Sequence, residues 1–133
     1  MITLHHAIKI TAPRAEVYRA LTDIAEMAAW HLGRIEGEIT PGKVLTLAPK
    51  PGMRFSWRTD KLEHDISIVQ TCVEGSGTSP GKVLTIKISD ADDGRTLVEL
   101  TDGEWSRDDS HRAFCNTHWG EVLHRLKTHI EKI

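Results

Sequence analysis

The sequence predicts an α+β domain in which a curved antiparallel sheet of about six to seven strands wraps around a long C-terminal α-helix. Short β-prone runs joined by turns fill the middle of the chain, and this pattern favours an antiparallel meander. A helical pattern from about residue 107 to residue 132 carries one continuous apolar stripe. Such a stripe needs a broad apolar partner, and the sheet is the only broad partner that the sequence offers.

The N-terminal part of the chain predicts one strand followed by two short helices. Apolar and polar residues alternate over Ile2–Ile10, which indicates a half-buried strand. Pro13 follows, and proline suits the first turn of a helix because its missing N–H would be unpaired there anyway. Asp23 and Glu26 have the spacing of a capping box, which predicts a second short helix through Trp30.

From Arg34 to Trp105 the sequence predicts one strand after another. The clearest amphipathic strand is Met53–Trp57, in which apolar residues alternate with arginine and serine. Turn signals such as Pro41-Gly42 and Asp92–Gly94 separate the runs. Short turns between successive strands indicate that neighbours along the chain are also neighbours in the sheet.

The predicted C-terminal helix runs from about Arg107 to Lys132. Ser106, Asp108, Asp109 and Ser110 offer oxygens that can cap its N-terminus. The residues that fall on its apolar face are Cys115, Trp119, Val122, Leu123, Leu126, Ile130 and Ile133.

Bulk composition limits the classes of function. Residues 1–133 fit a single domain, and the formal net charge of −2 argues against a general nucleic-acid binder. No apolar run approaches the ~18 residues needed to span a membrane. The N-terminus lacks a signal-like stretch, and the two cysteines are too few for a small disulfide scaffold. We therefore expect a cytoplasmic protein that carries no cofactor.

Four segments, taken together, resemble a known family. They are Tyr18–Asp23 followed by Ala29-Trp30, then Met53–Trp57, Gly94–Leu100, and Cys115–Leu123 with Leu126. In order and spacing they are similar to the SRPBCC (START/Bet v 1-like) superfamily, in the branch named after the activator of Hsp90 ATPase. The resemblance covers essentially the whole chain. It implies a helix-grip fold with a cavity between the sheet and the C-terminal helix.

The residues that we predict to bind a ligand are mainly aromatic. A pocket needs apolar walls and a few polar groups that orient the ligand, and indoles supply both area and one N–H donor. The alternative is that these side chains, like that of Trp119, are ordinary core. The predicted ligand-binding residues are Trp30, Phe55, Trp57, Trp105, Phe114, His118 and Val122.

Histidines are the second group of candidate functional residues in the chain. His111, Cys115 and His118 lie close to one helix face, and imidazole and thiolate are good zinc ligands. A third or fourth ligand is not identifiable nearby, so we predict no metal site. His118 is the candidate acid–base residue, and Glu99 or Glu104 could pair with it or with His111. The alternative is a core-edge histidine hydrogen-bonded to the sheet.

Three functions remain open from the sequence. The first is the binding of a small, largely hydrophobic molecule, aromatic or lipid-like, since relatives in the family bind lipids, sterols and polyketides. The second is an enzyme of the cyclase or hydrolase type that uses His118, because a few relatives have such activities. The third is a domain that binds a chaperone or another partner. A homodimer is compatible with all three.

Overall fold

The chain forms one strand, two short helices, six further strands and a long helix, as the sequence predicts. The computed structural model describes residues 1–132. In chain order the elements are β1 (Ile2–Ile10), α1 (Arg14–Thr22), α2 (Ile24–Trp30), β2 (Arg34–Gly37), β3 (Val44–Lys50), β4 (Met53–Glu63), β5 (Ser67–Glu74), β6 (Val83–Asp90), the 3-10 turn η1 (Asp92–Gly94), β7 (Thr96–Trp105) and α3 (His111–Glu131).

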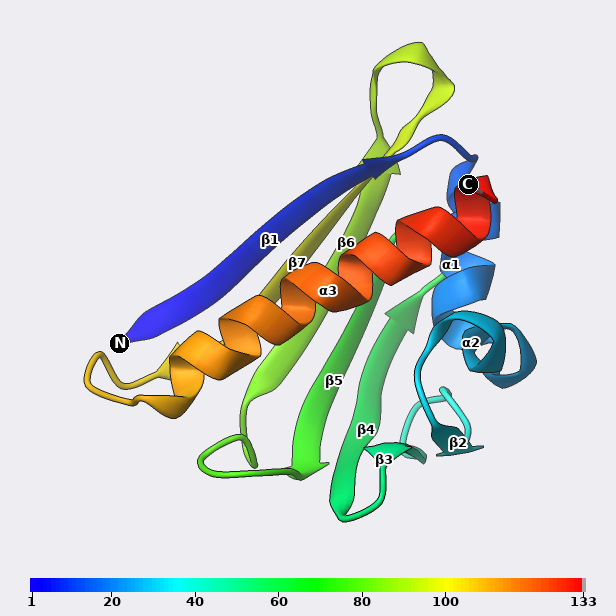
Figure 1. Ribbon diagram of the computed structural model, residues 1–133. Coiled ribbons are helices and arrows are strands. Elements are labelled where there is room, and N and C mark those ends of the chain that lie inside the picture. Colours follow the sequence, from blue (N-terminus) through cyan, green and yellow to red (C-terminus); the bar gives the residue numbers. More distant parts are fainter. Residues whose placement is uncertain (133) are drawn as a thin grey trace.

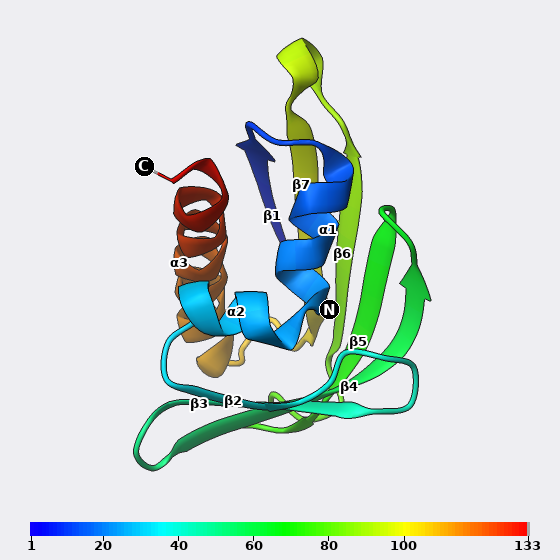
Figure 2. The same ribbon diagram turned by 90° about the vertical axis from the view of Figure 1, so that its right-hand side faces the viewer.

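The strands form one seven-stranded antiparallel sheet with the order β1-β7-β6-β5-β4-β3-β2. From β2 to β7 each strand pairs with its neighbour along the chain, which confirms the predicted meander. Strand β1 departs from this order because it pairs with β7 at one edge. Register shifts within the β4–β5 pairing accompany the curvature, since bulges bend the strand that carries them. Figure 2 shows β2 and β3 curling under α2.

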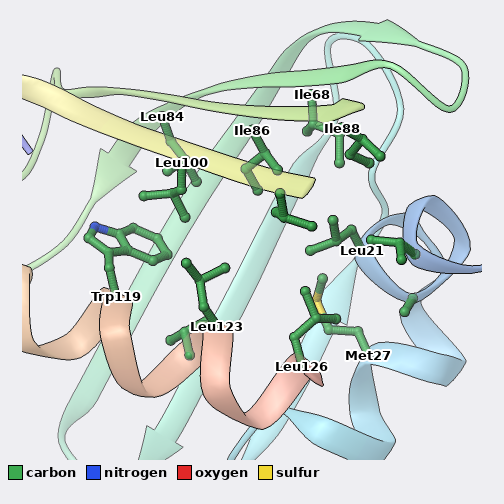
Figure 3. Packing of buried hydrophobic residues seen from close by; sticks show 14 of the residues in the cluster. Leu21, Met27, Ile68, Leu84, Ile86, Ile88, Leu100, Trp119, Leu123 and Leu126 are labelled. Carbon is green, nitrogen blue, oxygen red and sulfur yellow. The ribbon is translucent and has the colours of Figure 1, made fainter. Parts of the chain in front are cut away.

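Helix α3 lies across one face of this sheet, with α1 and α2 at one end (Figure 1). Its side chains Trp119, Leu123 and Leu126 point toward apolar residues of the strands (Figure 3). The buried residues of the helix are Trp119, Val122, Leu123, Leu126 and Ile130. The predicted stripe is therefore confirmed for these five; Cys115 is half-buried, and Ile133 lies outside the described residues.

The start of α3 differs from the prediction. The helix begins at His111 rather than near Arg107. The backbone N–H of Asp109 donates to the carbonyl oxygen of Ser106 at 3.1 Å, which makes a turn of the residues before the helix. Asp109 Oδ1 then accepts from the backbone N–H of His111 at 2.9 Å. The acidic group thus does bind the helix N-terminus, but it does so from a preceding turn.

Half of the predicted capping box is present at α2. Asp23 Oδ1 accepts from the backbone N–H of Glu26 at 3.1 Å. The Glu26 carboxylate turns away from this cap, because it pairs with Arg19 Nε at 2.9 Å and with His129 Nε2 of α3 at 3.4 Å. Trp30 Nε1 donates to the carbonyl oxygen of Ala20 at 2.9 Å. These contacts hold the two short helices together and join them to the end of α3.

Candidate functional site

A cavity of about 50 Å³ lies between the sheet and the N-terminal half of α3. Phe55 and Trp57 of β4, Trp105 of β7 and Trp119 of α3 supply its aromatic walls. The ring centroids of Trp57 and Trp119 lie 5.8 Å apart. A ligand in this cavity would therefore meet aromatic side chains from both the sheet and the helix.

A second cavity of about 50 Å³ lies further along the core. Leu84, Ile86 and Leu100 of the sheet and Leu123 of α3 are among its walls. Trp57 and Trp119 line both cavities, so this pair of indoles stands where the two spaces adjoin. Figure 3 shows Trp119 beside the apolar residues that bound the second space.

The predicted ligand-binding residues divide into three groups. Phe55, Trp57, Trp105 and His118 line the first cavity. Trp30 and Val122, together with Trp57, line the second.

Phe114 lines neither of these two cavities, and its prediction as a wall residue needs correction. Its side chain is 74% exposed. Phe114 precedes Cys115 by one residue, and one residue turns a helix by ~100°, which carries the side chain off the buried stripe.

A buried carboxyl group, which the sequence analysis did not single out, lines the first cavity. Asp102 is 2% exposed, and its Oδ2 accepts from Trp119 Nε1 at 2.9 Å. Its Oδ1 has no hydrogen-bond partner among the described residues, and neither has Trp105 Nε1. Burial raises the pKa of the Asp102 carboxyl above its usual value, whereas the hydrogen bond from Trp119, the indole N–H of Trp105 and the charge of Lys82 lower it. The Trp105 N–H is thus close enough to act on the carboxyl, although the two groups do not have the geometry of a hydrogen bond. The cavity thus contains a buried carboxyl group, and its neighbours offset part of the cost of burying its charged form.

The alternation of inward-facing and outward-facing residues along β7 explains why this carboxyl group faces inward. Val98, Leu100 and Asp102 alternate along the strand and are all buried. A register shift against β1 follows, and Trp105 rather than Glu104 is the next buried residue. The alternation that makes Val98 and Leu100 inward-facing could therefore have predicted from the sequence that Asp102 also faces inward.

The carboxylates proposed from sequence as partners of a catalytic histidine lie elsewhere. Glu99 Oε2 is 3.6 Å from His5 Nε2 of β1, and Glu104 is exposed. Neither lines the first cavity with His118, and His111 contacts Ser76 instead, so among the described residues neither carboxylate forms the pair considered from sequence. The acidic side chain that shares the cavity with His118 is Asp102.

Two histidines, His31 and His118, line the same cavity. The His118 ring stacks on Phe55 with centroids 6.1 Å apart and tilts against Trp119 at 5.6 Å. Burial lowers the pKa of His118, and the positive charge of Arg125 lowers it further. Burial likewise lowers the pKa of His31. Both imidazoles are therefore neutral at pH 7, and each carries one donor and one acceptor.

Acid is expected to destabilise the protein through these two histidines. Because the folded-state pKa of each lies below the ordinary value of 6.5, the unfolded chain binds protons more readily. Stability is then fully present above pH 6.5 and is lost as the pH falls. In urea unfolding at pH 7 and pH 5, His118→Gln should lose less stability than the unmodified protein. The matched control is exposed His124→Gln on the same helix, and an equal loss in the two variants would contradict the assignment.

Neither cysteine is an activated nucleophile. Cys72 and Cys115 are both free thiols. Burial raises the pKa of the Cys72 thiol to about 11 and also raises that of Cys115, so both remain protonated near neutral pH.

The triad His111, Cys115 and His118 does not form a metal-binding cluster in the structure. Within residues 1–132, no group of three or more histidine, cysteine, aspartate or glutamate side chains is arranged to hold an ion. His111 instead places Nε2 3.2 Å from Ser76 Oγ, and its ring packs against Trp105.

The curved antiparallel sheet and the long helix held against it define a helix-grip fold, and the family model that matches the chain places it in the SRPBCC class. Residues 11–131 match the family model described as Activator of Hsp90 ATPase homolog 1-like protein. The chain belongs to this family. A comparison with curated proteins found no match.

Solved structures share the fold at low sequence identity. The Aha1 dimer from Colwellia psychrerythraea has a TM-score of 0.88 and 23% identity, covering 98% of this chain and 97% of that one. A protein from Mesorhizobium loti has a TM-score of 0.85 and 15% identity, with 98% of both chains covered. An HSP90 activator from Plasmodium falciparum has a TM-score of 0.80 and 13% identity, covering 96% of this chain and 95% of that one.

None of the helices within residues 1–132 combines the length and the apolar character that a membrane crossing requires.

Proposed function

We propose that this protein binds a small, largely apolar molecule in the cavity between the sheet and α3. The observation that carries the proposal is the set of aromatic walls contributed by β4, β7 and α3 around that space. Aromatic side chains with a few polar groups are typical of ligand sites. Membership of a family whose fold commonly holds hydrophobic ligands supports the same function.

The size of the cavity limits what enters it without rearrangement. Its volume of about 50 Å³ is roughly a third of the ~150 Å³ of an engineered protein cavity that binds benzene. A ligand with an aromatic ring must therefore displace side chains. Phe55 and His118 are suited to this, because both are half-buried and stack on each other at 6.1 Å. A change of rotamer at this pair would widen the cavity.

Apolar probes are expected to raise the melting temperature. A ligand at 100 times its Kd adds about 2.7 kcal/mol to the apparent stability. We would screen anilinonaphthalene sulfonate and a library of aromatic fragments by thermal unfolding. Native mass spectrometry of the protein from its own host would then detect a molecule that co-purifies.

Two variants make this experiment specific. Cys115→Phe places a bulky ring on a residue that lines the cavity, so it should abolish the thermal shifts. Phe114→Ala changes the neighbouring, exposed side chain and should leave the shifts as they are. Equal shifts in Cys115→Phe and the unmodified protein, or no shift with any probe, would refute the proposal.

A partner-binding function is the second candidate. The family description and the Plasmodium falciparum relative both refer to activation of Hsp90. Phe114 offers an exposed aromatic side chain for such a contact. Purified Hsp90 from the same host should then hydrolyse ATP faster when the protein is added, and less so with Phe114→Ala. An ATPase rate that the protein leaves unchanged would contradict this function.

A further inference from the structure

Two buried polar atoms beside the first cavity have no hydrogen-bond partner. They are the acceptor Asp102 Oδ1 and the donor Trp105 Nε1, on side chains that are 2% and 1% exposed. Both side chains line the cavity and come from one end of β7. Buried polar groups are nearly always paired, so an unpaired donor and acceptor at one site require an explanation.

The two atoms make complementary demands on a ligand. Asp102 Oδ1 requires a donor, whereas the indole N–H of Trp105 requires an acceptor. Trp119 Nε1 already occupies Oδ2 at 2.9 Å, so the carboxyl group is held in place and Oδ1 is the oxygen that remains. A hydroxyl group meets both demands with one oxygen, and a carboxamide meets them with its N–H and its carbonyl.

A simple ionic group can pair with only one of these two atoms. The ammonium group of Lys82 lies 4.9 Å from the centroid of the Trp105 ring, and Lys82 also lines the cavity. A ligand ammonium could donate to Asp102 Oδ1, but Lys82 would repel it and it could not accept from Trp105. A ligand carboxylate could accept from Trp105, but it would offer Asp102 Oδ1 no donor.

We propose that the ligand is an uncharged aromatic or apolar molecule with a hydroxyl or carboxamide group, which donates to Asp102 Oδ1 and accepts from Trp105 Nε1. This inference rests on the proposed binding function and specifies the ligand class. The aromatic walls hold the body of the molecule, and the two atoms of β7 fix the position of its polar group.

A matched series of benzene derivatives tests the inference. Toluene, phenol, benzamide, benzylammonium, benzoate and acetophenone would be titrated at pH 7 by isothermal calorimetry or ligand-observed NMR. Phenol and benzamide should bind at least about tenfold more tightly than toluene, and the two ions should bind more weakly than phenol.

Asp102→Asn is the variant that tests the role of Oδ1 most directly. Its amide oxygen can keep the bond from Trp119, while its NH₂ replaces Oδ1 and turns the acceptor into a donor. Two donors then face the ligand, so acetophenone, whose carbonyl accepts twice, should bind more tightly than phenol. Toluene affinity should stay within about twofold, which would show that the cavity is intact. Phe114→Ala, at an exposed position, should keep the original preference for phenol.

The outcomes separate this inference from the proposed function. Binding of toluene and phenol with equal affinity would overturn the inference while leaving an apolar site. Tighter binding of benzylammonium than of phenol would overturn it in favour of a cation site. An indole N–H resonance of Trp105 that is unchanged by bound phenol would also overturn it, because the N–H would then bond to Asp102 itself. Failure of every compound to bind would count against the proposed function as well.

Discussion

Replacing Leu126 with alanine is expected to lower the free energy of unfolding by about 2–5 kcal/mol. Leu126 is 0% exposed and lies in the C-terminal half of α3, with its side chain in the apolar cluster between helix and sheet (Figure 3). The substitution removes apolar contacts and leaves a hole that the surrounding strands and α2 can only partly fill. Urea denaturation followed by far-ultraviolet circular dichroism measures the loss.

An exposed position on the same helix provides the control for this prediction. Phe114→Ala removes a larger side chain from α3 but changes little buried surface, so its effect should stay within about 0.5 kcal/mol. A loss below about 1 kcal/mol for Leu126→Ala would be inconsistent with a helix that is gripped by the sheet along this stripe.

Trp119→Phe is expected to destabilise the protein by about 1–3 kcal/mol at pH 7, because it removes the hydrogen-bond donor of a buried carboxyl group. Trp119 Nε1 donates to Asp102 Oδ2 at 2.9 Å, and phenylalanine cannot replace this donor. The carboxyl group would then remain in the core with neither oxygen hydrogen-bonded by the protein. Chemical unfolding at pH 7 gives the change in free energy.

The pH dependence of this loss separates the hydrogen bond from the loss of indole volume. The pKa of Asp102 is raised in the folded protein, so the folded state binds the proton more readily and ionisation of Asp102 weakens the fold as the pH rises above 3.8. The hydrogen bond from Trp119 stabilises the ionised form of Asp102 and so reduces this loss of stability. The penalty of Trp119→Phe should therefore be larger at pH 7 than at pH 4, whereas lost volume costs the same at both. An equal penalty at the two pH values would show that the hydrogen bond contributes little.

The cavity itself joins residues that are remote in the sequence. Trp57, Asp102 and Trp119 come from β4, β7 and α3, and each is buried on the inward face of its own element. Periodicity within an element predicts which face is buried, but it carries no information about which residues of other elements lie opposite. For this reason the aromatic walls were predictable in part, whereas the contact of Trp119 with Asp102 was not.

Two sequence-based predictions, the burial of Phe114 and the start of α3, differ from the structure for a local reason. Phe114 is apolar and lies near the predicted face of α3, but its rotation about the helix axis places it outside the cluster of buried residues. The start of α3 was placed too early, because Ser106 and Asp109 are good capping residues in a turn as well as at a helix end. In both cases the residue type was compatible with two environments.

The amino-acid sequence by itself determined the order of the elements, the meander from β2 to β7 and the buried stripe of α3 from Trp119 to Ile130. These properties depend on local alternation and on helical spacing, which burial imposes along each element. Only the tertiary structure decided that one oxygen of Asp102 is left unpaired and that Lys82 lies over Trp105. The physical reason is that a register shift in β7 and the packing of α3 across the sheet choose these neighbours, and both arise from contacts between distant segments.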